Sequence, residues 1–233
     1  MNQILNEGGN VFKTPDGGEA TQRINKADVE PTLKWLEKIV GFNLTDHMLG
    51  STGIKDTSGD LDVAIDKEKI DKNQLVAKLQ AWVDKNAKGD ETKSWIAKTG
   101  ISVHFKTPIN GDPKNGYVQT DLMFGDPKFM AFAMRGSADS EFKGQHRMIM
   151  IASIAKAQGY KWSPTNGLVD RITNEPVTKI PDEVAKTLLG PNATAADMTS
   201  VETINKKIKV DPNYENLVKD AKDWFEKDGL ELP

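Results

Sequence analysis

The stretch that decides the fold is Leu49-Gly-Ser-Thr-Gly-Ile-Lys-Asp-Thr-Ser-Gly-Asp-Leu-Asp-Val-Ala-Ile65. Its last six residues alternate between polar and apolar side chains, which predicts a strand over residues 60–65. The apolar face of this strand consists of Leu61, Val63 and Ile65. Asp60 and Asp62 then share the opposite face, about 6.6 Å apart along a strand that rises about 3.3 Å per residue. Two carboxylates so placed can converge on one cluster of cations.

A third carboxylate is expected on a neighbouring strand. The stretch Val118-Gln-Thr-Asp-Leu-Met-Phe124 offers Asp121 inside an otherwise apolar strand. An unpaired buried aspartate is costly, so a bound metal is a reasonable explanation for it. Carboxylate oxygens suit Mg²⁺ or Mn²⁺. The sequence thus predicts Asp60, Asp62 and Asp121 as metal ligands. The alternative for each aspartate alone is a solvated carboxylate on a strand face or edge.

The turns before the first strand are suited to binding phosphate. Gly50 and Ser51 allow backbone amides and a hydroxyl to approach phosphate oxygens closely. Ser58 and Gly59 offer a second contact, and Lys55 offers positive charge. Two metals about 3.5 to 4 Å apart beside such a site would hold the attacking and leaving oxygens of a phosphoryl displacement.

Working outward, the pattern predicts an α+β fold with a sheet domain followed by a mostly helical subdomain. Residues 1–26 are polar and Gly-rich and are interpreted as an arm, residues 27–130 as the sheet domain and residues 131–233 as the helical subdomain with a small β-hairpin around 160–177. In the sheet domain, helices are expected from Asp28 to Gly41 and from Asp71, and strands over 101–105 and 117–124. In the subdomain, helices are expected over 127–135, 143–158, 182–189, 199–208 and 212–228, the last with Asp211 as its cap.

The composition is that of an ordinary globular protein, with 233 residues, 28% of them charged, and no cysteine. The absence of cysteine excludes disulfides and thiolate metal sites and suits a reducing compartment, so we expect a cytoplasmic protein. The first residues lack a basic region followed by a long apolar run, so neither export nor a membrane partner is expected. A net charge of −3 gives no global attraction to nucleic acid.

The ordered motifs resemble the polymerase β nucleotidyltransferase superfamily. The Gly-Ser turn, the Ser-Gly-Asp-x-Asp stretch and the later strand aspartate match its core signature. Further motifs are similar to the C-terminal part of family X DNA polymerases, and the resemblance spans about residues 45–190. They are Met134-Arg-Gly-Ser137, Ala155-Lys-Ala-Gln-Gly-Tyr-Lys-Trp-Ser-Pro-Thr-Asn-Gly-Leu168 and Pro181-Asp-Glu-Val-Ala-Lys-Thr-Leu-Leu-Gly190. The compact plan and Gly-rich arm are also similar to small bacteriophage-encoded members of the superfamily.

The resemblance implies a polymerase β palm-like mixed sheet and a magnesium-dependent transferase. Such an enzyme moves a nucleoside monophosphate from a nucleoside triphosphate, with either ribose or deoxyribose, to a hydroxyl acceptor and releases pyrophosphate. It implies that Asp60, Asp62 and Asp121 are the catalytic metal ligands, with Asp121 also the base toward the attacking hydroxyl. It further implies that Gly50, Ser51 and Ser58 bind triphosphate and that Gly136 and Ser137 line the nucleotide pocket.

The chain also departs from family X. The loop from Ser51 to Asp60 is one residue shorter, so Lys55 only approximates the place of a phosphate-binding arginine, and Gln119 and Met123 stand where arginines are usual. No helix-hairpin-helix module precedes the core. The acceptor therefore stays open among a nucleic-acid 3′ end, a protein and a small molecule. The alternative function is a non-catalytic nucleotide-binding or assembly module, such as a phage structural protein, built on the same core.

The remaining residues are given structural roles. The three histidines, His47, His104 and His146, are scattered without metal-ligand spacing, which favours packing or surface positions. Among the tryptophans, Trp162 alone lies in the hairpin near the family's nucleotide side, where it could stack a base.

Overall fold

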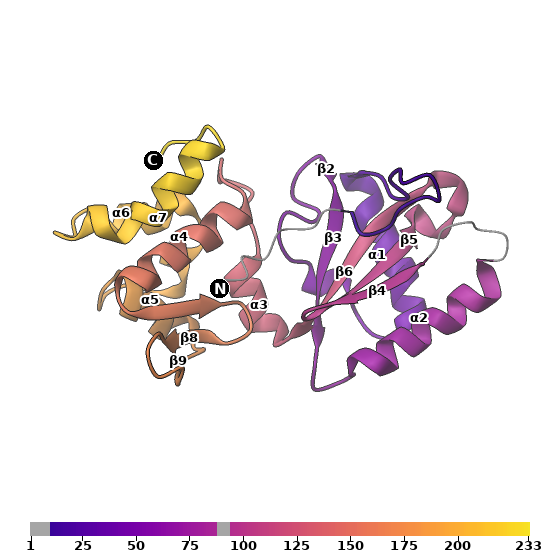
Figure 1. Ribbon diagram of the computed structural model, residues 1–233, viewed down its shortest axis with the longest axis horizontal. Helices are drawn as coiled ribbons and strands as arrows, with labels where there is room; N and C mark the ends of the chain where they lie inside the picture. The colour runs from indigo at the N-terminus through magenta and orange to yellow at the C-terminus, as the bar shows by residue number, and fades with distance from the viewer. Residues whose placement is uncertain (1–9, 88–93) are drawn as a thin grey trace. The chain divides into compact units, whose positions relative to one another are not determined.

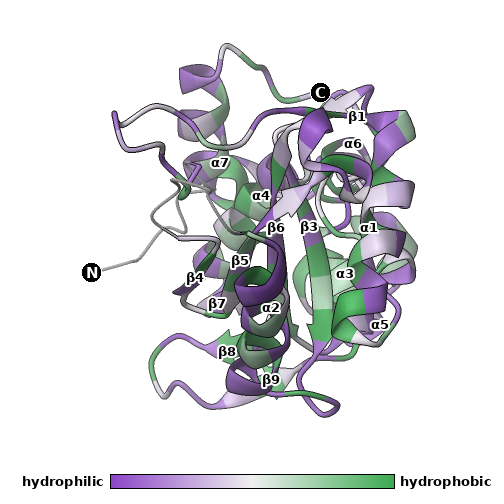
Figure 2. Cartoon of the chain, turned by 90° about the vertical axis from the view of Figure 1, so that its right-hand side faces the viewer, coloured by the Kyte–Doolittle hydropathy of each residue, from purple (hydrophilic) through white to green (hydrophobic). Residues whose placement is uncertain are grey.

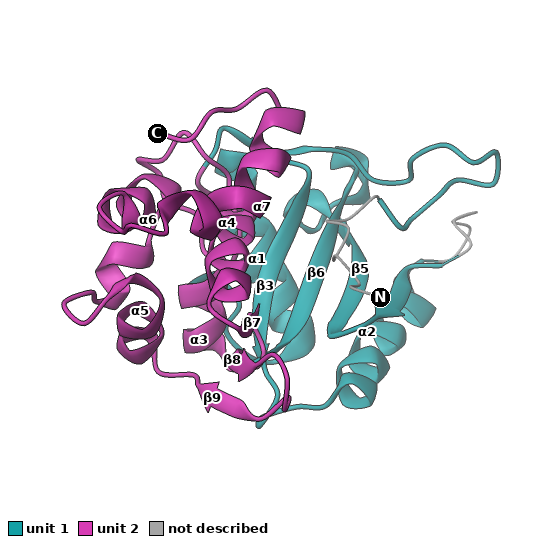
Figure 3. Cartoon of the chain, turned by 60° about the vertical axis from the view of Figure 1, so that its left-hand side comes forward, with its two compact units in different colours: residues 1–48, 55–125 teal, residues 49–54, 126–233 magenta. Residues whose placement is uncertain are grey.

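The computed structural model describes residues 10–87 and 94–233, which divide into two compact units (Figure 3). Unit 1 contains residues 10–48 and the described part of Lys55–Gly125, and unit 2 contains Leu49–Ile54 and Asp126–Pro233. Both units combine helices with strands, so the α+β class expected from the sequence is confirmed. Unit 1 ends at Gly125, whereas the sequence placed a domain boundary near residue 130.

Unit 1 is built on a four-stranded mixed sheet whose strands follow the order β3-β6-β5-β4 (Figure 1). The strands are β3 (Asp60–Asp66), β4 (Ile96–Thr99), β5 (Ser102–Pro108) and β6 (Tyr117–Gly125). β3 and β6 run parallel, and β5 is antiparallel to both of its neighbours, β6 and β4. The parallel pair needs a long connection, which α2, β4 and β5 supply. The sequence predicted β3, β5 and β6 but missed β4.

Two helices cover the apolar face of this sheet: α1 (Lys26–Val40) and α2 (Lys72–Asn86). Buried side chains of α1, α2, β3, β5 and β6 form one hydrophobic core. Figure 2 shows that both helices carry hydrophobic and hydrophilic stretches, as expected of helices with one buried side. α1 ends as predicted at Gly41, whose φ of 87° suits glycine and whose N–H donates to Glu37 O. α2 begins at the predicted cap, Asp71, which accepts a hydrogen bond from Gln74 N.

The start of α1 differs from the prediction. Asn25, not Asp28, precedes the helix, so Asp28 lies in its first turn and Pro31 lies inside it. The cause is the short strand β1 (Ile24–Asn25), which pairs with β2 (Thr57–Ser58) and leads directly into the helix. Lys26 N–H also donates to Asp56 O, which anchors this first helical residue to the loop before β2.

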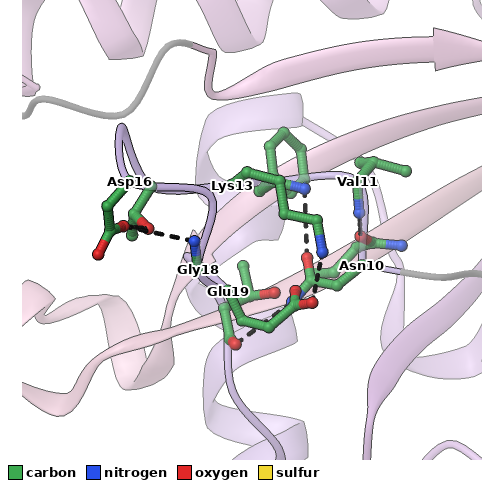
Figure 4. Close-up of polar contacts among 10 residues, drawn as sticks. Asn10, Val11, Lys13, Asp16, Gly18 and Glu19 are labelled. Atoms are coloured by element: carbon green, nitrogen blue, oxygen red, sulfur yellow. Dashed lines mark hydrogen bonds and ion pairs between the residues drawn. The ribbon is translucent and has the colours of Figure 1, made fainter.

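The N-terminal segment that the sequence assigned to an arm differs from that expectation where it is described. Residues 1–9 lie outside the described residues, but residues 10–25 belong to unit 1. Phe12 is 2% exposed. Lys13 and Glu19 pair through a backbone bridge and an ion pair across a tight turn, in which Gly18 N–H donates to the Asp16 carboxylate (Figure 4). Val11 N–H donates to Gln119 Oε1 on β6. This segment, which we call the N-terminal loop (residues 10–22), is therefore packed against the sheet.

Unit 2 is mostly helical and surrounds its own hydrophobic core. Its helices are α3 (Pro127–Met134), α4 (Gly144–Ala157), α5 (Pro181–Leu189), α6 (Val201–Ile208) and α7 (Tyr214–Lys227). The predicted hairpin is a three-stranded sheet of β7 (Tyr160–Ser163), β8 (Gly167–Asp170) and β9 (Pro176–Thr178). Short 3-10 helices complete the described structure: Thr45–His47, Ile109–Gly111, Pro113–Asn115 and Ala195–Met198.

Two details of unit 2 bear on the sequence predictions. α7 begins after Asn213, two residues later than expected, because the Asp211 carboxylate accepts the Asn213 N–H within the preceding turn. Trp162 packs against Phe129 and Phe132 with ring centroids 5.8 and 6.1 Å away, so it belongs to an aromatic cluster. Among residues 10–87 and 94–233, no helix combines the length and the apolar character that a membrane crossing requires.

Candidate metal centre

Three carboxylates meet on the polar face of the unit 1 sheet. Asp60 and Asp62 point to one side of β3 because they are two residues apart on the same strand. The parallel register of β3 and β6 sets Asp62 directly beside Asp121. One oxygen of each of the three carboxylates lies within 4.8 Å of the others. The structure therefore brings together the three aspartates that the sequence selected.

The electrostatics of this cluster favour a bound cation. Burial, and to a smaller extent the neighbouring Asp121, together raise the pKa of Asp60 to about 6, although Arg23 and His104 oppose the shift. Ionised carboxylates this close repel one another unless a positive charge lies between them. A set of three hard oxygen donors fits Mg²⁺ or Mn²⁺ and offers no soft ligand for other transition metals.

Asp121 is held by two hydrogen bonds that end on the same oxygen. His104 Nδ1 lies 2.6 Å from Asp121 Oδ1, and Gln119 Nε2 donates to Oδ1 at 2.9 Å. His104 is the direct antiparallel partner of Asp121 in the β5–β6 pairing. From the sequence alone, His104 is expected only in a packing or surface position. The sequence pattern places His104 on the polar face of a predicted strand. It does not predict the strand register that sets His104 opposite Asp121.

The predicted phosphate contacts of unit 1 differ in their accessibility. Lys55 and Gly59 are exposed, as a ligand contact requires. Ser58 is only 3% exposed, and its hydroxyl has no hydrogen-bond partner within the described part of the chain. The contact between the Ser58 hydroxyl and a triphosphate stays a prediction from the sequence.

Arg23 is a cation near the carboxylate cluster, and it belongs to the segment that the sequence predicts to be an N-terminal arm. Its Nε and Nη2 donate to Thr57 Oγ1 at 3.1 and 2.9 Å, and Nη2 also donates to Thr57 O. The β1–β2 pairing places it there, and it lies close enough to Asp60 to oppose the rise in the pKa of that carboxyl. A side chain on Gly59 would approach Arg23 Nη1 to 3.3 Å. An exposed, oriented guanidinium suits phosphate oxygens.

The other predicted nucleotide contacts lie together in unit 2. Gly50 N–H donates to Met134 O at 3.2 Å, and Gly136 N–H donates to Gly50 O at 2.8 Å. Gly50 has a φ of 54°, and a Cβ on Gly136 would lie 3.0 Å from Gly50 O, so both positions need glycine. Ser51 and Ser137 follow these glycines and are half-buried. The two Gly-Ser turns, which lie 86 positions apart in the sequence (136 − 50), are thus one hydrogen-bonded structure.

Arg135 links these turns further. Its Nη1 donates to three carbonyl oxygens of the 49–54 loop, at 3.1 Å to Leu49, 3.3 Å to Gly50 and 2.6 Å to Thr52. Arg147, which is 3% exposed, donates in turn to the carbonyls of Phe132, Arg135 and Met198. Two arginines therefore hold the backbone of both Gly-Ser turns in place.

Comparison of the chain with protein-family models finds no matching family, and comparison with curated proteins finds no match.

Proposed function

We propose that the chain is a metal-dependent nucleotidyltransferase that moves a nucleoside monophosphate from a nucleoside triphosphate to a hydroxyl and releases pyrophosphate. The observation that carries this proposal is the meeting of three carboxylates from two adjacent parallel strands, with ligand oxygens within 4.8 Å of one another. The same arrangement supports assigning unit 1 to the nucleotidyltransferase fold of the polymerase β superfamily, which the ordered sequence motifs resemble.

In the proposed reaction, the acceptor oxygen forms a bond to the α-phosphorus while the bond to the pyrophosphate oxygen breaks. Asp60, Asp62 and Asp121 would hold Mg²⁺ or Mn²⁺, which neutralises charge on the attacking and leaving oxygens when bound. Asp121 accepts the proton that the hydroxyl loses. The exposed Arg23 guanidinium binds phosphate oxygens. Arg23 thereby supplies the positive charge that family X polymerases obtain from an arginine near the position of Lys55.

The resemblance to family X polymerases adds the nucleotide contacts of unit 2 to the proposal. The paired turns present Gly50 and Gly136 with little side-chain bulk, which suits close approach of a ligand to their backbone. Ser51 and Ser137 supply hydroxyls beside them. Substituting each serine by alanine is expected to raise the KM for the triphosphate more than it lowers kcat.

The test is label transfer from α-labelled nucleoside triphosphates with Mg²⁺, using DNA and RNA 3′ ends, proteins and small hydroxyl compounds as acceptors, with pyrophosphate release measured in parallel. Asp60→Ala, Asp62→Ala and Asp121→Ala should each abolish both signals. Asp66→Ala is the matched control, because Asp66 lies at the far end of β3, opposite Gly125. If the wild-type protein releases no pyrophosphate with any acceptor, or if the control variant loses activity as the other three do, the proposal fails.

A further inference from the structure

The Asp121 carboxylate is asymmetric in its surroundings. Both hydrogen bonds that it receives end on Oδ1: one involves His104 Nδ1 at 2.6 Å and the other comes from Gln119 Nε2 at 2.9 Å. The side chains of His104 and Asp121 are only 10% and 11% exposed. A buried carboxylate oxygen with two donors has little remaining capacity for another ligand. The second oxygen, Oδ2, is therefore the one available to a cation or to a substrate hydroxyl.

The orientation of Gln119 is itself determined by the N-terminal loop. Val11 N–H donates to Gln119 Oε1 at 2.9 Å, so the amide oxygen faces Val11 and the amide nitrogen faces Asp121. Gln119 is 2% exposed, and so it has no water-filled space in which to turn. The Gln119 contact alone, however, is a single bond from a side chain on the same strand as Asp121. With this one hydrogen bond alone, the Asp121 carboxylate could still rotate about the line from Gln119 Nε2 to Asp121 Oδ1.

His104 supplies the second constraint, and it comes from another strand. β5 places His104 directly opposite Asp121, on the side of β6 away from β3. Asp121 therefore has Asp62 as its cross-strand neighbour on one side and His104 on the other. Because an ionised carboxylate only accepts hydrogen bonds, this contact requires the tautomer with a proton on Nδ1. Two donors on one oxygen, from different strands, fix the plane of the carboxylate.

We propose that His104 is a positioning residue that holds Oδ1 of Asp121 and so turns Oδ2 toward the metal and the attacking hydroxyl. This inference rests on the proposed function, because it assigns His104 a task only if Asp121 binds a metal. Groups that orient metal ligands in this way affect metal affinity or activity by about 10- to 100-fold when they are removed. His104 touches neither metal nor substrate in this assignment and acts through Asp121.

Three substitutions separate the hydrogen bond from the volume of the ring. In His104→Asn, the amide nitrogen is attached to Cγ, as Nδ1 is in histidine, so it can donate to Asp121 Oδ1. In His104→Gln, the amide nitrogen lies one bond further from the backbone and is misplaced for this contact. His104→Leu keeps a branched side chain without any donor. Gln and Leu are thus matched controls for Asn.

The readouts are Mn²⁺ binding, followed by electron paramagnetic resonance without nucleotide, steady-state kcat and KM, and thermal unfolding in EDTA. We expect His104→Leu and His104→Gln to bind Mn²⁺ about 10- to 100-fold more weakly, with a fall in kcat of similar size and a smaller change in the KM for the triphosphate. His104→Asn should remain close to the wild type in both. Unfolding in EDTA identifies any variant that has simply lost its fold.

The outcomes distinguish this inference from the function on which it rests. If Asp60→Ala leaves Mn²⁺ binding unchanged, the proposed metal centre itself is wrong. If Asp60→Ala weakens binding while a folded His104→Leu variant binds as the wild type does, the metal centre stands and the role of His104 is refuted. If folded His104→Asn is as defective as His104→Leu, the ring volume rather than the hydrogen bond matters, and the inference is again refuted.

Discussion

The carboxylate cluster should destabilise the metal-free protein, and Asp60 offers a direct measure of this cost. Burial and the neighbouring Asp121 raise its pKa from 3.8 to about 6, which means that the folded protein disfavours the ionised form. The difference is roughly 2 in pKa, and at about 1.4 kcal/mol for each pKa unit this corresponds to about 3 kcal/mol when the group is fully ionised. Because Asp60 is partly exposed, solvent screens part of this cost, and the figure is an upper bound.

Replacing Asp60 by Asn removes the ionisable group while keeping its shape. In EDTA at pH 8, we therefore expect Asp60→Asn to increase the free energy of unfolding by up to about 3 kcal/mol. The sign follows from linkage: between pH 6 and pH 4 the folded wild type binds more protons than the unfolded chain, so its stability rises as the pH falls. The advantage of the Asn variant should shrink over this range. Adding Mg²⁺ should stabilise the wild type at pH 8 but not Asp60→Asn.

The assay is denaturant unfolding followed by circular dichroism at several pH values between 8 and 4. Asp56→Asn is the matched control, because it removes one carboxylate from an exposed residue of the same segment. Its effect should be small at every pH. Two results would refute the view that the ionised Asp60 carboxylate destabilises the folded, metal-free protein. One is an equal free energy of unfolding for the wild type and Asp60→Asn at pH 8, and the other is a stabilisation by Asp60→Asn that is as large at pH 4 as at pH 8.

Two further predictions concern the framework around the site. Gly136→Ala should reduce the stability measured by thermal unfolding by about 1–3 kcal/mol, because the new Cβ would lie 3.0 Å from Gly50 O. The control variant Ser137→Ala should reduce stability less. Equal losses in the two variants would contradict the close packing of the two turns. Burial raises the pKa of Glu37, but hydrogen bonds from Thr45 and Leu44 outweigh the effect of burial, so the pKa in the folded protein lies below 4.5. The ionised Glu37 side chain therefore stabilises the fold above pH 4.5, and this stabilisation is lost as the pH falls through the pKa of the folded state. Glu37→Gln should therefore cost about 1.5–3 kcal/mol at pH 7 and flatten the acid limb of the stability curve, and a variant with the wild-type acid limb would refute this.

The elements that the sequence predicted well carry strong local signals. The alternation of residues 60–65 specifies both the strand and the face shared by Asp60 and Asp62, and that face needs no knowledge of the partner strand. The capping residue Asp71 and the glycine at position 41 likewise mark helix ends through contacts with their own neighbours in sequence. In these cases, local chemistry and the tertiary structure favour the same conformation.

The features that escaped prediction depend on pairing between distant segments. His104 faces Asp121 only because β5 pairs with β6 in one register, and a shift of one residue would turn the ring to the apolar face. Arg23 approaches Asp60 only because residues 24–25 pair with residues 57–58. The edge strand β4 is short, and only part of its length is apolar, so it carries no periodic signal. Such residues become visible only once the partner strand is known.

The assignment of Leu49–Ile54 to unit 2 has a consequence for dissecting the protein. The polypeptide passes from one unit to the other three times, after Met48, after Ile54 and after Gly125. A fragment that starts at Asp126 would lack the three carbonyl groups that accept from Arg135, as well as the oxygen that accepts from Gly136. Expressing the helical half by itself should therefore deprive the half-buried Arg135 of these three acceptors, and a stable fragment would need the six-residue loop grafted back.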